Sequence, residues 1–265
     1  MKERLYILDW IRVFVMFYII FVWHIDDYAE NIFLNNSTSL LTRLSLHVFV
    51  FLSSYLLSRN YVISEKKAIR EFIKKRAIRL YPLYLLSLIM LLIISSISFK
   101  GFFAGIFLLN MILNVDLRTL WFISMIFNYY ILLSIILYNY SLNKTIYISL
   151  IFWISCYILH KSLGIISPKL LTYYPSFLIG IICAKHIQIG LSWGESKIIQ
   201  ALSYASFCMY LFHRVIYWAL LKFYTPETNI MIVVYLACVG IPSICLVSIG
   251  LQKGYDKINP LLFRV

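Results

Sequence analysis

Residues 8–27 read LDWIRVFVMFYIIFVWHIDD, and this stretch decides the fold of the chain. It is long and apolar enough to cross a membrane, yet it carries Asp9 and Arg12 near its start and His24 near its end. A charged side chain facing lipid costs several kcal/mol, so such residues usually face protein or water and often mark a site. Asp9 and His24 lie about 22 Å apart along a helix, and the hydrocarbon core is roughly 30 Å thick. The stretch predicts a first span at about 5–24, with an ion pair at one interface and an imidazole near the other.

The composition is that of an integral membrane protein. Of its 265 residues, 62% are hydrophobic and 13% are charged, against roughly 45–50% and about 25% in a soluble domain. The net charge of +13 does not indicate nucleic-acid binding, because the basic residues gather beside apolar segments, where they set topology or contact anionic lipid. The five cysteines lie in apolar segments, so we expect no metal site and no disulfide framework. Short connections predict one domain over residues 1–265.

Successive apolar segments predict an all-α, polytopic transmembrane helical bundle of about 8–9 spans. After the first span, we expect others at about 44–58, 80–98, 120–139, 145–160, 170–184, 198–221 and 229–250. Residues 101–113 are ambiguous, because they either cross the membrane or form an interfacial or re-entrant piece. The second alternative gives eight crossings and leaves the basic carboxy-terminal tail inside, which the charge rule prefers.

The loop of residues 59–79 sets the predicted orientation. It holds eight basic residues against two acidic ones, and by the positive-inside rule it is cytoplasmic. The N-terminus is then cytoplasmic too, in a multi-pass protein of the plasma membrane. Within the loop, apolar residues recur at helical spacing between basic ones, which predicts an amphipathic helix on the inner leaflet. Pro82 follows, and we expect it to open the third span, because proline is tolerated in a first helical turn.

His24 is the strongest catalytic candidate from residue chemistry. Asp26 and Asp27 follow it closely and can orient an imidazole or hold it as a base, and Asp26 is the first choice. On the other predicted side of the membrane, Arg76 and Arg79 share one helical face, and two guanidinium groups so spaced suit a phosphate. The competing interpretation is that this arginine pair only sets topology. His213 follows an aromatic helix, where a polar side chain often only joins two helices.

Five patches of the sequence, in order, resemble the acyltransferase-3 family of integral membrane acyltransferases. The family pattern has an L-D-x-x-R start with a later His, an F-F-x-x-S-G-[FY]-L-like helix, R-x-x-R-[IL]-x-P, an L-W-F-[IL] helix opening and an S-Y-x-x-Y-L-x-H-like helix. The matching residues here are Leu8, Asp9, Arg12 and His24; Val50 to Leu56; Arg76, Arg79, Leu80 and Pro82; Leu120 to Ile123, with Trp121 among them; and Ser203, Tyr204, Tyr210, Leu211 and His213. Ser54 stands where the family has glycine, which puts a close helix approach there in question.

The resemblance implies that the first-helix histidine is the catalytic base and that the arginine pair helps to hold an acyl donor, commonly an acyl-CoA. We therefore expect a membrane-bound O-acyltransferase. It would move an acyl group, with acetyl as the first choice, from acyl-CoA to a hydroxyl of a cell-surface glycan or its lipid-linked precursor. Acyl-CoA is a donor substrate here, and no permanently bound cofactor is expected. Tyr204 is considered as the donor to the oxyanion. Asp9, Arg12, Trp121 and His213 complete the candidate site.

Two other function classes stay open from the sequence. A transporter or glycan translocator would use the same intramembrane charges, and Pro175 and Pro242 are signs of the broken helices that such proteins use. Transporters often repeat one hydropathy pattern in two halves, and this sequence shows no such repeat. A non-enzymatic membrane subunit of a glycan synthase is the other alternative.

Overall fold

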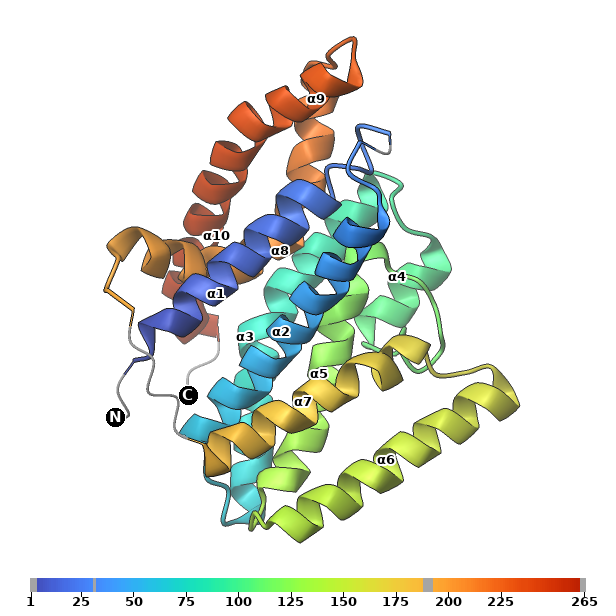
Figure 1. The fold of residues 1–265 in the computed structure, drawn as a ribbon, viewed down its shortest axis with the longest axis vertical. Coiled ribbons are helices and arrows are strands. Elements are labelled where there is room, and N and C mark those ends of the chain that lie inside the picture. Colours follow the sequence, from blue (N-terminus) through green and yellow to red (C-terminus); the bar gives the residue numbers. More distant parts are fainter. Residues whose placement is uncertain (1–3, 31, 188–192, 263–265) are drawn as a thin grey trace. The chain divides into compact units, whose positions relative to one another are not determined.

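The computed structural model describes residues 4–30, 32–187 and 193–262, and the regular structure within them is helical, without a β-sheet (Figure 1). The elements are α1 (Tyr6–Phe17), η1 (Tyr18–Trp23), α2 (Asn36–Asn60), α3 (Lys66–Ile93), α4 (Phe99–Ile106), η2 (Arg118–Leu120), α5 (Trp121–Leu137), α6 (Leu142–Leu163), α7 (Pro168–His186), α8 (Lys197–Phe223), α9 (Asn229–Tyr235), η3 (Leu236–Gly240) and α10 (Ile241–Leu262). Here η1 and η3 are π-helices and η2 is a 3₁₀ turn.

Among the described residues, six helical stretches are long and apolar enough to cross a membrane. They are Tyr6–Trp23, Asn36–Asn60, Lys66–Ile93, Arg118–Leu137, Leu142–Leu163 and Asn229–Asn259. The protein is therefore all-helical and multi-pass. The helices α7 and α8, where the sequence also predicts spans, form as expected with 19 and 27 residues but do not belong to these six.

The helix α3 joins the predicted amphipathic helix and the predicted third span into one helix of 28 residues. Pro82 lies inside this helix, so the prediction that it stands in a first helical turn was wrong. A membrane helix tolerates an interior proline when neighbouring groups satisfy the carbonyl that the proline leaves unbonded. The basic segment is therefore the first part of a long apolar helix.

The ambiguous residues 101–113 form most of the short helix α4 and the turns that follow it. With eight residues, α4 is about 12 Å long, well short of the roughly 30 Å core. Two tyrosines of α3 hold its end, since Tyr84 donates to Gly105 O at 3.0 Å and Tyr81 donates to Ile106 O at 2.8 Å. α4 is thus a short helix that packs against α3.

The chain divides into two compact units. One unit contains the described parts of residues 1–49 and 190–265, where α8 packs against both α1 and α10 (Figure 1). The buried face of α8 mixes apolar and polar side chains, including Ser203, His213 and Arg214. This face turns towards helices that carry Asp9 and His24, so the unit encloses ionisable groups.

The other unit, residues 50–189, has an aromatic core. Tyr129 of α5 is fully buried, donates to Leu170 O at 2.7 Å and lies 4.7 Å from the ring of Phe177 on α7. Tyr174 of α7 donates to Ser149 of α6 at 2.7 Å. Buried tyrosines combine a large apolar ring with a hydroxyl that finds a partner, and they tie α5, α6 and α7 together.

A close helix contact occurs at Ser54, the position where the family has glycine. The glycine lies instead on the facing helix, because a Cβ built on Gly180 of α7 would stand 2.0 Å from Ser54 Oγ and 2.6 Å from Phe51 O. Small residues let membrane helices approach closely. Gly180 of α7 therefore leaves room for Ser54, and the two helices approach closely at this point.

Candidate active site

A π-helical turn positions His24. The first span does not stay α-helical to its end, and in η1 the His24 N–H bonds to Ile19 O, five residues back, at 3.0 Å. Turns of this kind often occur at functional sites. Tyr217 of α8 donates to Ile20 O within the same turn at 3.3 Å. The widened turn is thus bonded to α8, and it brings His24 against that helix.

His24 stacks face to face on His213 of α8. Their ring centroids lie 4.6 Å apart and their planes differ by 11°. His24 is 7% exposed and His213 is 0% exposed. The ring of Tyr217 meets His213 edge-on, with centroids 6.2 Å apart. Two candidates from opposite ends of the sequence therefore form one buried imidazole pair.

Three nitrogen atoms of this cluster are buried and have no hydrogen-bond partner within the described ranges, namely His24 Nδ1, His213 Nε2 and Arg214 Nε. Most buried polar atoms in proteins are paired. An imidazole nitrogen can accept or donate, whereas a guanidinium nitrogen only donates. The cluster therefore offers a substrate both types of hydrogen-bonding group in one buried place.

The carboxylate that joins this cluster is Asp27. It forms an ion pair with Arg214, which is 8% exposed. Asp26 instead accepts a hydrogen bond from Phe33 N–H at 2.9 Å and makes none to His24 within the described ranges. The structure therefore gives Asp26 a turn-closing contact and does not bring it to the imidazole that it was expected to orient.

Sequence reasoning missed Arg214 and the particular role of Asp27. Arg214 follows His213 directly in an apolar helix. Since an intramembrane cation needs a partner, this arginine was the available signal for a carboxylate nearby. Asp26 and Asp27 are adjacent, so residue chemistry alone does not separate them. The backbone turn after His24 decides which carboxylate meets α8.

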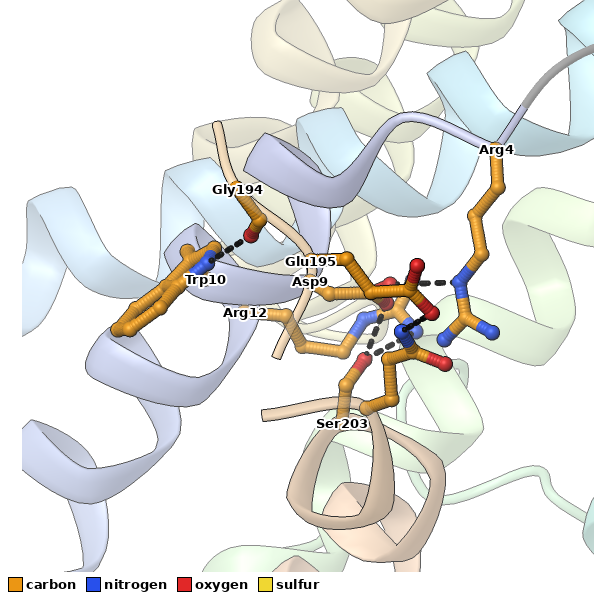
Figure 2. Close-up of polar contacts among 8 residues, drawn as sticks. Arg4, Asp9, Trp10, Arg12, Gly194, Glu195 and Ser203 are labelled. Carbon is orange, nitrogen blue, oxygen red and sulfur yellow. Dashed lines mark hydrogen bonds and ion pairs between the residues drawn. The ribbon is translucent and has the colours of Figure 1, made fainter. Parts of the chain in front are cut away.

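Near the starts of α1 and α8, Asp9 and Arg12 both contact the same serine. Ser203 donates to Asp9 at 2.6 Å and accepts from Arg12 at 3.4 Å, while Arg4 pairs with Asp9 at 2.8 Å (Figure 2). The expected ion-pair region is thus a network with Ser203 at its centre. It joins the L-D-x-x-R patch to the S-Y patch of α8, so α1 and α8 run parallel from this network to the histidine pair.

Tyr204 lies at the same end as this network. Its hydroxyl donates to Asp256 of α10, and Asp256 also accepts from Gln252 at 3.1 Å. Nine residues of α8 separate Tyr204 from His213, which is about 13 Å along a helix. Tyr204 is therefore not brought to His24, and its contact joins α8 to α10.

In the other unit, the two arginines of the predicted donor site differ in their surroundings. Arg76 donates to Tyr61 Oη at 2.9 Å, and its guanidinium carbon lies 5.4 Å from the Tyr61 ring and 5.9 Å from the Phe72 ring. Arg79 is exposed, and the structure gives it no hydrogen bond or ion pair within the described ranges. Arg76 is thus held by aromatic rings, while Arg79 is available to a ligand.

Trp121 begins α5 in the same unit and is covered by its neighbours. Its ring stacks on Tyr173 of α7 at 5.8 Å, and the Lys169 ammonium lies 4.2 Å from the ring centroid. Lys169 in turn pairs with Asp116 at 3.9 Å. The contacts of Trp121 therefore join α5 to α7, and they do not connect it to another candidate of the site.

These features define a multi-pass helical membrane protein with a buried imidazole pair where the end of the first span meets the middle of α8. The chain belongs to the acyltransferase-3 family, because residues 5–195 match that family, which is described as an acyltransferase domain. By family it is a membrane acyltransferase, and the resemblance seen in the sequence is confirmed. The matched range includes His24 and Arg76, whereas Ser203 and His213 lie beyond it. No curated protein and no solved structure matches the chain.

Proposed function

We propose that the protein is an O-acyltransferase that moves an acyl group, acetyl in the first instance, from acyl-CoA to a hydroxyl of a cell-surface glycan or its lipid-linked precursor. The observation that carries this proposal is the buried stack of His24 and His213. A positioned imidazole with an unpartnered nitrogen can take the proton of a hydroxyl. Family membership supplies the reaction class, acyl transfer.

In the proposed reaction, His24 is the general base. Its unpartnered Nδ1 accepts the proton of the acceptor hydroxyl as the O–H bond breaks. The acceptor oxygen forms a bond to the thioester carbonyl carbon, and the C–S bond then breaks. The departing thiolate takes the proton back from the His24 imidazolium. The products are an ester and free CoA, so atoms and charge balance without another reactant.

Arg214 is a better candidate than Tyr204 for stabilising the oxyanion. Arg214 follows His213, its ion pair with Asp27 holds the guanidinium in place, and its buried Nε–H has no partner within the described ranges. Preorganised donors of this kind contribute about 10²–10³-fold to rate. Tyr204, in contrast, already donates to Asp256 near the start of α8.

For the acyl donor, we propose that Arg79 contacts a phosphate of CoA from the cytoplasmic side, with Arg76 beside it. The exposure of Arg79 and the aromatic support of Arg76 favour this role. Guanidinium groups bind phosphate oxygens in two-pronged fashion. The eight basic residues of loop 59–79 support a cytoplasmic location. CoA would be a substrate in this scheme, with no permanently bound cofactor.

The parallel packing of α1 and α8 supports eight crossings. Two helices that cross in the same direction need an odd number of crossings between them, and α2, α3, α5 and α6 supply four. The fifth is then α7, whose 19 residues are about 28 Å long, because α4 is too short. Adding α8 and the final stretch Asn229–Asn259 gives eight, with the N-terminus in the cytoplasm of a plasma-membrane protein.

The transporter alternative was supported by signs of broken helices at Pro175 and Pro242, and the described helices do not bear these out. α7 runs through Pro175 without a break, and Pro242 lies inside the continuous helical stretch Asn229–Asn259, directly after the π-helix η3. A membrane helix tolerates an interior proline when neighbouring groups satisfy the freed carbonyl, so neither proline ends a helix. The acyltransferase proposal therefore accounts better for the described helices.

The experiment that tests the proposal measures release of free CoA from acetyl-CoA by the purified full chain in lipid nanodiscs, with and without a polyol acceptor. We expect release by the wild type and none above background by His24→Ala. His160→Ala is the matched control, because His160 lies at the end of α6 with its own contact to Ile166 O at 2.9 Å. Equal CoA release by the wild type and His24→Ala contradicts the proposal.

A further inference from the structure

His213 has a fixed proton position. Its Nδ1 lies 2.8 Å from Tyr210 O. A carbonyl oxygen accepts hydrogen bonds and has none to donate, so Nδ1 carries the hydrogen in neutral imidazole and Nε2 holds a lone pair. This is the arrangement in which one ring nitrogen orients the imidazole and the other acts on a substrate.

The lone pair on Nε2 has no donor within the described part of the chain, although His213 is 0% exposed. The hydroxyl of Tyr217, whose ring meets His213 edge-on, already donates to Ile20 O at 3.3 Å. A histidine that only joined two helices would be expected to use both ring nitrogens in such a buried place. His213 uses one and keeps the other available.

His24 presents a second unpartnered nitrogen in the same cluster. The two rings are nearly parallel, and their centroids are 4.6 Å apart. The stacking keeps the two imidazole groups next to each other, and a ligand with two neighbouring hydroxyls has one hydroxyl to offer to each unpartnered nitrogen. A simple alcohol has one hydroxyl proton and satisfies one nitrogen only.

We propose that His213 Nε2 binds a second hydroxyl of the acceptor, next to the hydroxyl that His24 deprotonates, so that the site selects acceptors with a vicinal diol, as in a sugar ring. The inference rests on the proposed acyl transfer. His213 is then a positioning and specificity-determining residue. No bond forms or breaks at His213, and the neighbouring hydroxyl keeps its proton throughout.

The test compares two small acceptors that differ by one hydroxyl, 1,2-propanediol and 1-propanol, with acetyl-CoA as donor and the full chain in nanodiscs. The measured quantity is the ratio of kcat/KM for the diol to that for the alcohol. We expect a ratio of about ten in the wild type, the contribution of one neutral hydrogen bond. In His213→Gln we expect this ratio to fall to the value set by the number of reactive hydroxyls alone. Most of the loss should be a higher KM for the diol.

Two control variants separate this inference from the proposed function. His24→Gln should slow transfer to both acceptors by a similar factor. His160→Gln should keep the wild-type ratio. His160 also bonds a backbone carbonyl through Nδ1, but it belongs to the unit of residues 50–189, which does not contain His24 or His213. A wild type that does not prefer the diol, or a preference that persists in His213→Gln, overturns the assignment of His213. A wild type that transfers to neither acceptor contradicts the acyl transfer itself.

Discussion

The Ser203 hydroxyl donates to the Asp9 carboxylate at 2.6 Å, which connects the start of α8 to the start of α1. The same hydroxyl accepts from Arg12 at 3.4 Å. The bond is partly buried, and a hydrogen bond to a charged group contributes about 1.5–3 kcal/mol. The bond therefore helps to keep the two helices parallel and in register, so that His24 meets His213 further along α8.

Ser203→Ala should lower the Tm of the purified protein by several degrees and weaken acyl transfer, because it removes the group shared by Asp9 and Arg12. The control is Ser206→Ala, since Ser206 is buried as well but donates to Ser203 O within its own helix, at 2.7 Å. Thermal unfolding in detergent measures both variants. An equal loss in the two variants would show that the contact with Asp9 contributes nothing of its own.

Gly180→Ala should be strongly destabilising. The new methyl group would stand 2.6 Å from the Phe51 carbonyl oxygen, a backbone atom that cannot move without shifting α2. The control is Gly254→Ala in α10, where the added carbon meets nothing within 4 Å and alanine favours the helix by about 1 kcal/mol. The Tm should fall clearly in the first variant and stay level or rise in the second. A stable, active Gly180→Ala protein would contradict the close contact.

The orientation can be checked by cysteine labelling in a background without native cysteines. Lys67→Cys in the basic loop should resist an impermeant thiol reagent applied outside the cell. Lys100→Cys at the start of α4 and Leu113→Cys after it, both at exposed positions, should react, because α4 does not cross in the eight-span arrangement. If Lys100→Cys and Leu113→Cys label from opposite sides, α4 crosses and the orientation of α8 is wrong.

The donor proposal predicts different outcomes for the two arginines. Arg79→Lys keeps the charge and touches no described partner, so the topology and the Tm should stay unchanged. The KM for acetyl-CoA should rise, because lysine lacks the planar guanidinium group that binds phosphate through two hydrogen bonds. Arg76→Lys should also lower the Tm, since it gives up the bond to Tyr61 and the contact with Phe72. Steady-state kinetics and thermal unfolding measure the pair. Unchanged donor KM in both variants would leave the arginines as a topology signal.

Much of the fold could be predicted from the sequence, because apolar length and charge placement determine where helices lie. The first span, the basic segment and the later helices follow from these properties. The prediction that Pro82 stands in a first helical turn was wrong. A proline that neighbouring groups accommodate inside a helix looks the same in sequence as a proline that begins one. The contact of Ser54 with Gly180 depends on two helices meeting, which no local pattern encodes.

The candidate site was predictable in its parts but not in its assembly. His24 and His213 could each be chosen by residue chemistry, whereas their stacking depends on the π-helical turn η1, which helical periodicity does not reveal. The choice between Asp26 and Asp27 depends on one turn of backbone. Tyr204 belongs to a family motif, yet it lies nine positions before His213, near the start of α8 and far from His24.

The most direct test of the central claim, that His24 is the base, is acyl transfer by His24→Gln measured beside acetyl-CoA affinity. Glutamine keeps a hydrogen bond and much of the shape but cannot take a proton at neutral pH, and a general base contributes about 10²–10⁴-fold to rate. We predict that His24→Gln loses transfer about as severely as His24→Ala while donor affinity stays at the wild-type value. Substantial transfer by His24→Gln would contradict the mechanism.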